Sequence, residues 1–426
     1  MKETGETTDR LFDTAADLFW HKGYAATTTR EIATAVGIQQ ASLYHHMASK
    51  EDLLHKICLS SLQRFLAEVP AAVNAVAGPL DRVRMVIRAH QFTLLQNQQR
   101  NVTLLTELRA LSVPHRKEVL ALREKYERFV RSTIENAQAA GVIRRDIPAN
   151  YLGLALLSVL NHSALWFRKD QALQEEQLAD VLTKVFLQGA ATPVARGSFA
   201  ARGSFAGRGS LSLPDLATNV NKNGARFRKR PKAESNGHNP ALARALDAAI
   251  GLFSRKGYTA TSTREVAALL GIQKASLYYH ISSKEDLLYM ICRASLEQIR
   301  HDVETAIQEV KDPLDRQRTL ISSHIESLLR DADKHSVTFT EMHALSQDRL
   351  AQVLALRDAH EILVRSVLKE AQTAGVLRGD IDAKYLSLAL LGMMNRVTVW
   401  YRRGGPLSPN QVGQLFAVIF LAGAAA

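Results

Sequence analysis

Two sets of polar side chains carry the chemistry of this chain, and they have nearly the same residue types at the same spacing. Each set combines amides and hydroxyls, which can bind the edges of nucleic-acid bases, with donors for phosphate oxygens. The first set comprises Thr29, Arg30, Gln39, Gln40, Ser42, Tyr44, His45, His46 and Lys50. The second set comprises Thr263, Arg264, Gln273, Lys274, Ser276, Tyr278, Tyr279, His280 and Lys284. The sequence therefore predicts two DNA-binding sites of one design.

The two sets belong to a duplication of most of the chain. Residues 10–191 align with residues 244–425 at an offset of 234 without a gap, and 83 of the 182 positions are identical. A chain of 426 residues also exceeds what one hydrophobic core usually serves. We therefore expect five parts: a DNA-binding head at 1–60, a body at 61–191, a linker at 192–240, a second head at 241–294 and a second body at 295–426.

The hydrophobic pattern is helical almost throughout, and no segment shows sustained period-two alternation, so an all-α fold is expected. A first helix should stop at Gly23, and Thr28 with Glu31 forms a possible capping box that opens a second helix. A short third helix at 39–46 would turn Leu43 inward and leave its polar residues outside. This is helix-turn-helix architecture, in which the last short helix can enter the major groove. The alternative, a three-helix core with an incidental polar face, does not explain why the polar set occurs twice.

The segment TTTREIATAVGIQQASLYHHMASKEDLL and its counterpart TSTREVAALLGIQKASLYYHISSKEDLL resemble the signature of the TetR/AcrR transcriptional regulators. The resemblance implies that each repeat has three DNA-binding helices, a connecting fourth helix and a helical body that binds an inducer. It places the recognition helices at 39–46 and 273–280. It also implies phosphate contacts by Thr29, Arg30, Tyr44, His46 and Lys50, and by their counterparts Thr263, Arg264, Tyr278, His280 and Lys284.

Ordinary members of that family are homodimers that pair through their last two helices. Here those helices would be 147–168 with 174–190, and 381–402 with 409–423. Because the two units are fused, we expect an intramolecular pseudo-dimer, and pairing between two chains stays open. The resemblance further implies a repressor that an inducer releases from its operator.

The two predicted recognition helices differ at two positions, Gln40 against Lys274 and His45 against Tyr279. Lysine favours guanine acceptors and glutamine suits adenine, so an operator with two unequal half-sites is expected. The alternative is that both residues contact phosphate. The heads also differ in charge, because residues 1–60 carry six Lys and Arg against eight Asp and Glu, whereas residues 241–294 carry seven against four.

The net charge of +12 is concentrated between the repeats. Residues 192–240 contain nine Lys and Arg against two acidic residues and are rich in Gly, Ser, Asn and Pro, which is typical of a disordered linker. A flexible linker of this length spans about 35 to 42 Å on average. Its basic run at 226–232 either lies along DNA phosphates or is simply solvated.

Polar residues that recur on apolar helices are candidates for an inducer pocket, and the alternative is that the histidines are satisfied core or surface residues and the tryptophans core anchors. They are His90, Glu107, Asn161 and Trp166, with His324, Glu341, Asn395 and Trp400. The segment WYRRGGPLSPNQVGQLF is similar to the end of TetR-type regulators that respond to acyl-CoA thioesters, which implies phosphate contacts by Arg396, Arg402 and Arg403. Residues 63–105 and 297–339 are identical at only 12 of 43 aligned positions. This divergence indicates either two different pockets or drift on exposed surface.

Other classes of function are disfavoured. No nucleophile motif, phosphate-binding glycine loop or metal-ligand spacing is present, so neither an enzyme nor a cofactor is expected. Cys58 and Cys292 are expected to be buried and without chemistry. The chain has no apolar run long enough for a membrane span and no signal peptide, which favours the cytoplasm. A constitutive DNA-organising protein without an inducer remains the alternative to a ligand-released repressor.

Overall fold

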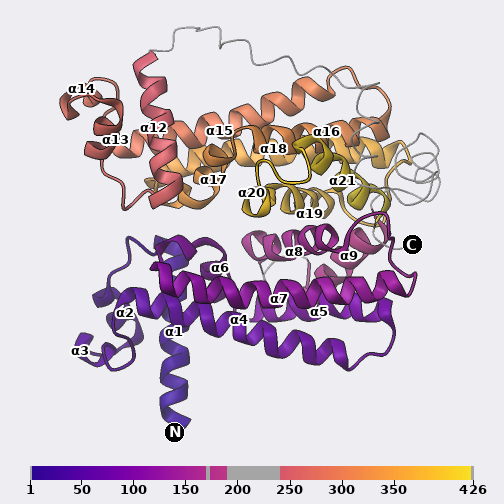
Figure 1. Ribbon diagram of the computed structural model, residues 1–426, viewed down its shortest axis with the longest axis horizontal. Helices are drawn as coiled ribbons and strands as arrows, with labels where there is room; N and C mark the ends of the chain where they lie inside the picture. Colours follow the sequence, from indigo (N-terminus) through magenta and orange to yellow (C-terminus); the bar gives the residue numbers. More distant parts are fainter. Residues whose placement is uncertain (1, 169–172, 190–239, 424–426) are drawn as a thin grey trace. The chain divides into compact units, whose positions relative to one another are not determined.

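The computed structural model describes residues 2–168, 173–189 and 240–423, and these residues form helices and connecting loops without a β-strand (Figure 1). The all-α prediction is therefore confirmed. The first repeat contains α1 (Lys2–Lys22), α2 (Thr29–Val36), α3 (Gln40–Leu43), α4 (Lys50–Asn74), α5 (Pro79–Gln96), α6 (Gln98–Thr106), the 3-10 helix η1 (Leu108–Ala110), α7 (Val113–Ala139), α8 (Ala149–Trp166) and α9 (Glu175–Gln188). The second repeat contains α12 (Pro240–Lys256), α13 (Thr263–Leu270), α14 (Lys274–Tyr278), α15 (Lys284–Ile307), α16 (Pro313–Arg330), α17 (Ala332–Glu341), η3 (Met342–Ala344), α18 (Gln347–Thr373), α19 (Ala383–Asn395), α20 (Val397–Trp400) and α21 (Pro409–Ala422).

The described residues divide into two compact units that correspond largely to the two repeats. The first unit also takes in Lys384–Arg396, which covers most of α19. The predicted linker at 192–240 lies outside the described residues except for Pro240, which already begins α12. None of the described helices is long and apolar enough to cross a membrane.

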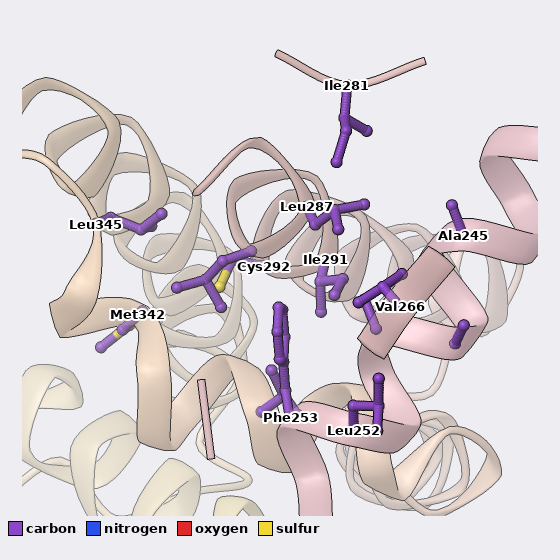
Figure 2. Packing of buried hydrophobic residues seen from close by; sticks show 14 of the residues in the cluster. Ala245, Leu252, Phe253, Val266, Ile281, Leu287, Ile291, Cys292, Met342 and Leu345 are labelled. Carbon is purple, nitrogen blue, oxygen red and sulfur yellow. The ribbon is translucent and has the colours of Figure 1, made fainter. Parts of the chain in front are cut away.

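The core of each head continues into the body of the same repeat. In the second repeat, Phe253 of α12, Val266 of α13 and Ile291 of α15 pack in one cluster with Met342 and Leu345 from the body (Figure 2). The equivalent cluster of the first repeat joins Phe19, Ile32 and Leu54 with Leu104 and Val119. The predicted boundaries at residues 60 and 294 fall inside α4 and α15, so each head shares a continuous helix with its body.

Capping residues fix the helix ends near the predicted positions. The first helix ends at Lys22, and Gly23 follows with a φ of 81°, as the sequence predicts. At the start of α4 the Ser49 side chain accepts a hydrogen bond from the Asp52 amide, and Ser283 and Asp286 repeat this at the start of α15. The long helices that carry the heads therefore begin at defined residues.

Three predicted helix extents are wrong. The recognition helices are shorter than expected, because after Leu43 the amides of Tyr44, His45 and His46 bond three residues back, a tighter turn than the α-helix. The predicted helix at 381–402 is interrupted at Arg396, between α19 and α20. The break precedes Val397, Thr398 and Val399, and the last two have β-branched side chains that favour helix less than the Ala and Leu of the first repeat.

Candidate nucleic-acid interface

A capping box orients the second helix of each head, as predicted. The Glu31 amide donates to Thr28 Oγ1 at 3.2 Å, and the Thr28 amide donates to Glu31 Oε2 at 2.8 Å. Ser262 and Glu265 make the same pair of bonds in the second head. The hydrogen bond from Lys22 is the main reason why the pKa of Glu31 falls to about 2, and the Lys256 bond lowers the pKa of Glu265 to about 2. Both carboxylates are therefore charged at neutral pH and hold the start of the helix.

Left-handed glycines then turn the chain into the third helix. Gly37 has a φ of 78° and Gly271 a φ of 69°, and both amides bond back to carbonyls of the preceding helix. Leu43 and Leu277, which follow, are fully buried, as the pattern predicts. Anchoring one leucine per short helix leaves the remaining residues of that helix at the surface.

Most of the predicted DNA-contacting residues lie on this surface. The exposed ones are Arg30, Gln39, Gln40, Tyr44 and His45 in the first head, and Arg264, Gln273, Lys274, Ser276, Tyr278 and Tyr279 in the second. Thr29, Ser42, His46, His280, Lys50 and Lys284 are partly buried, and Thr263 is buried. The structure thus brings amides, hydroxyls and cations together on the short helix and the start of the helix before it. This is the surface that a helix-turn-helix presents to DNA.

Lys50 and Lys284 are engaged inside the heads. The Lys50 ammonium donates to the carbonyl oxygens of Tyr24 at 2.8 Å and Thr27 at 2.6 Å, and lies 4.4 Å from the centre of the Tyr24 ring. Lys284 makes the same contacts with Tyr258 and Thr261. Partial burial lowers the pKa of both lysines. In this structure they hold the loop before the second helix, and their contact with phosphate stays a prediction.

The two heads have different local contacts at the positions where their recognition helices differ in sequence. In the first head Gln40 Nε2 donates to Thr29 Oγ1 at 3.2 Å. In the second head Thr263 Oγ1 instead lies 3.2 Å from the Tyr278 hydroxyl, and the Lys274 ammonium lies 5.4 Å from the Tyr278 ring centre. Tyr279, which replaces His45, is 86% exposed. The two heads therefore present different side chains to a partner from the same backbone.

Contacts that the sequence did not reveal join each head to its body. Arg100 of α6 donates to Asp13 Oδ1 at 2.6 Å and to Asp9 Oδ1 at 3.0 Å, both on α1. The Ser112 amide donates to Glu51 of α4 at 2.8 Å, and the Ser346 amide donates to Glu285 in the same way. These partners lie up to 91 residues apart, so no local pattern could identify them.

Only some of the predicted pocket residues lie together. His90 is fully buried, with Nδ1 2.8 Å from the Tyr126 hydroxyl, and burial lowers its pKa to about 3 despite a hydrogen bond with Asn161. In the second body His324 Nδ1 lies 3.1 Å from Nε2 of His360, whose pKa burial lowers to about 4. Tyr126 and His360 occupy equivalent positions, and the sequence analysis missed both.

The other candidates are dispersed. Glu107 acts electrostatically on Tyr24, Lys50 and Cys58 near the first head, and Glu341 acts on Lys284 and Cys292 near the second. Trp166 and Asn395 are partly buried, and the Trp400 ring lies 5.9 Å from that of Phe416.

The three candidate arginines differ in their surroundings. Burial lowers the pKa of Arg396 to about 9, whereas Arg402 and Arg403 are exposed. No cluster of metal-ligating side chains occurs among the residues that the structure describes. Cys58 and Cys292 are buried free thiols, and burial raises the pKa of each to about 12.

Comparison with known proteins places both repeats in one family. Residues 11–57 and 245–289 match the family described as bacterial regulatory proteins, tetR family, and residues 76–190 and 310–424 match the tetracyclin repressor-like C-terminal domain. The transcriptional repressor KstR2 of Mycobacterium tuberculosis is 27% identical over 179 residues, which are 42% of this chain and 90% of that protein. KstR2 of Rhodococcus jostii is 28% identical over 199 residues, 46% of this chain and 96% of that protein.

A solved structure of AibR in complex with isovaleryl coenzyme A and operator DNA is 28% identical, covers 42% of this chain and 96% of AibR, and has a TM-score of 0.39. Each of these matches has the length of about one repeat. Because the paired N-terminal and C-terminal matches occur twice, the chain belongs to the TetR family of transcriptional regulators, as a tandem of two complete family units.

Proposed function

We propose that this protein is a transcriptional repressor that binds a quasi-palindromic operator with two unequal half-sites. The observation that carries the proposal is the pair of heads, which expose nearly the same polar set on short helices held by one buried leucine. The names of its curated relatives, HTH-type transcriptional repressors, support repression.

The unequal half-sites are expected because the two recognition helices differ in sequence. Gln40 is exposed and bonded to Thr29, so its amide is held at the edge of the interface, whereas the Lys274 cation lies beside an exposed aromatic ring. A good contact to a base gives about 1 to 3 kcal/mol of discrimination. The first half-site should therefore favour adenine and the second guanine at the contacted position.

Operator selection from random DNA tests this assignment. The wild-type chain should yield two different half-sites, and the chain with both Gln40→Lys and Lys274→Gln should yield the same pair exchanged between the heads. Footprinting of the variants Arg30→Ala and Arg264→Ala, each of which weakens one head, assigns each half-site to its head. Half-site preferences that do not respond to the exchange would show that both residues contact only phosphate.

Release by a small ligand is the second part of the proposal. The buried pairs His90 with Tyr126 and His324 with His360 give the two bodies different polar interiors, so the bodies would bind different ligands or only one would bind. The resemblance near Trp400 points to an acyl-CoA thioester, whose phosphates would contact the exposed Arg402 and Arg403. Arg403 Nη2 donates to the Arg330 carbonyl at 2.9 Å and would bind phosphate through its other N–H groups. A ligand releases DNA only if it binds the DNA-free arrangement of the protein more tightly.

Isovaleryl coenzyme A is a suitable first probe because the AibR structure holds it. We expect it to raise the melting temperature of the protein and to release a selected operator. At a ligand concentration 100 times the dissociation constant, binding would stabilise the folded protein by about 2.7 kcal/mol. Arg402→Ala with Arg403→Ala should weaken both effects. If a wider panel of thioesters and fatty acids changes neither stability nor DNA binding, the constitutive DNA-organising alternative is favoured.

A further inference from the structure

The helices α4 and α7 of the first repeat (Figure 1) meet at two histidines in face-to-face contact. The ring centres of His55, on α4, and His115, on α7, lie 3.8 Å apart, and the ring planes differ by 8°. His115 Nδ1 lies 2.9 Å from Glu51 Oε1. His55 Nε2 lies 3.1 Å from Glu118 Oε2, without the alignment of a hydrogen bond. These four residues form the first junction, where head and body meet through two side chains that can bind a proton.

The second repeat builds the same junction around a cation that is always charged. The second junction consists of Glu285, Tyr289, Arg349 and Gln352, in place of Glu51, His55, His115 and Glu118. The Arg349 guanidinium lies 5.4 Å from the Tyr289 ring centre. It pairs with Asp286, and its Nη1 lies 3.8 Å from Glu285 Oε2. A protonated His115 would reproduce this arrangement, which is a cation that lies against an aromatic ring and faces carboxylates.

Carboxylates surround the place where that proton would bind. The charged and titratable groups on the elements that meet here are Lys50, Glu51, Asp52 and Lys56 of α4, Arg116, Lys117 and Glu118 of α7, Glu107 after α6, and Tyr24 after α1. Burial raises the pKa of Glu51 and Asp52, but hydrogen bonds and the nearby His115 lower it further, so both values lie below the usual range. Burial, Glu51 and Glu107 raise the pKa of Tyr24 to about 12, so this phenol stays neutral.

The carboxylate of Asp52 connects the first junction to the end of the recognition segment. Its Oδ2 accepts a hydrogen bond from the Ala48 amide at 2.9 Å and lies 2.9 Å from Lys56 Nζ. The same Nζ donates to the His46 carbonyl at 2.9 Å. A charge on His115, which acts on Asp52, is therefore one side chain away from the backbone that follows the recognition helix.

We propose that the first junction is a proton-sensitive clamp, in which protonation of His115 fastens the first head to its body. The imidazolium pairs with Glu51 and stacks on a neutral His55, as Arg349 lies against Tyr289. His115 is the accessible member of the pair, since its side chain is 35% exposed and that of His55 is 9% exposed. Because like charges at this distance repel, His55 stays neutral while His115 carries the proton. The second head has a permanent clamp, so the two heads differ most at alkaline pH.

Hydrogen–deuterium exchange of the full chain measures the two junctions separately, with exchange times adjusted to the intrinsic rate at each pH. A charge-assisted hydrogen bond is roughly twice as strong as a neutral one, so segment 46–54 should be about fivefold more protected at about pH 6 than at about pH 8. The matched segment 280–288 should have the same protection at both pH values.

Substitutions that exchange the two junctions identify the responsible group. His115→Arg should protect segment 46–54 equally at both pH values, and His115→Gln should leave it at the less protected level at both. Arg349→His should transfer the pH response to segment 280–288. His21→Gln is the matched control, because His21 is exposed and lies 3.4 Å from Asp17 of its own helix, and it should leave the response unchanged.

The exchange measurement needs no DNA, so failure of the clamp is distinguishable from failure of the proposed repressor function. A wild-type segment 46–54 with the same protection at both pH values would overturn the proposal. A response of equal size in both junctions would do so as well. A response that persists in His115→Gln would assign it to another group, such as His46, and would also overturn the proposal.

Discussion

One buried position carries different polar side chains in the two repeats. Asn101 Nδ2 donates to the carbonyls of Thr93 at 3.1 Å and Leu94 at 2.8 Å, near the end of α5. The second repeat has His335 there, fully buried, with Nδ1 2.5 Å from the Ser295 hydroxyl. Burial lowers the pKa of His335 to about 3, so the folded protein holds a neutral imidazole.

His335 makes stability depend on pH in a predictable direction. An unfolded histidine has a pKa of about 6.5, so between about pH 6.5 and 3 the unfolded state binds the extra proton and stability falls as pH falls. His335→Asn, which installs the first repeat's residue, should reduce the loss in unfolding free energy between pH 7 and 5 by about 2 kcal/mol. Urea unfolding at the two pH values measures this, and an equal loss in both proteins would contradict the assignment.

At this scale the sequence predicts residues whose partners are local. The Thr28–Glu31 capping box and the inward Leu43 follow from spacing alone and are confirmed. The bonds from Arg100 to α1 and from Lys50 to the loop before α2 join residues at least 23 positions apart. Periodicity carries no information about such partners, and a polar residue that anchors a loop has the same appearance as one that contacts DNA.

The geometry of each head depends on the turn between its second and third helices. Gly37 adopts a left-handed conformation, and a Cβ built on it would meet nothing within 4 Å. Substitution there therefore acts through backbone strain alone and not through a clash.

Gly37→Ala should lower the stability of the first unit by about 1 to 2 kcal/mol and weaken operator binding, because the recognition helix begins three residues later. Gly271→Ala makes the matched change in the second head. Differential scanning calorimetry and operator titration of both variants provide the measurement. Unchanged operator affinity in a folded Gly37→Ala protein would show that the turn does not position the recognition helix.

The sequence predicts which helices exist more reliably than where each helix ends. The predicted helices exist, but α3 ends in a tighter turn, and the last long helix is divided at Arg396. Both differences depend on a few hydrogen bonds at a helix end, where a small energy decides between alternatives.

At the scale of the whole molecule, the tandem arrangement predicts how many chains occupy one operator. The flexible linker that the sequence predicts at 192–240 would have an average span of about 35 to 42 Å and would hold the second unit close to the first at high effective concentration. One chain of 47.1 kDa would then supply both heads.

Light scattering of the protein with a selected operator should give one chain per DNA duplex, and scrambling one half-site should weaken binding by about a thousandfold or more. Two chains per duplex at saturation would show instead that pairing occurs between chains and that each operator meets four heads.

The continuous helix α4 has a mechanical consequence. Its 25 residues span about 38 Å, and its first turns, up to residue 60, lie in the head while its later turns belong to the body. A helix of that length acts as a lever, since a tilt of about 5° around one end displaces the other by about 3 Å, close to the 3.4 Å spacing of bases along a DNA strand. A ligand that rearranges a few side chains in a body therefore needs no unfolding of the head to move its recognition helix out of register.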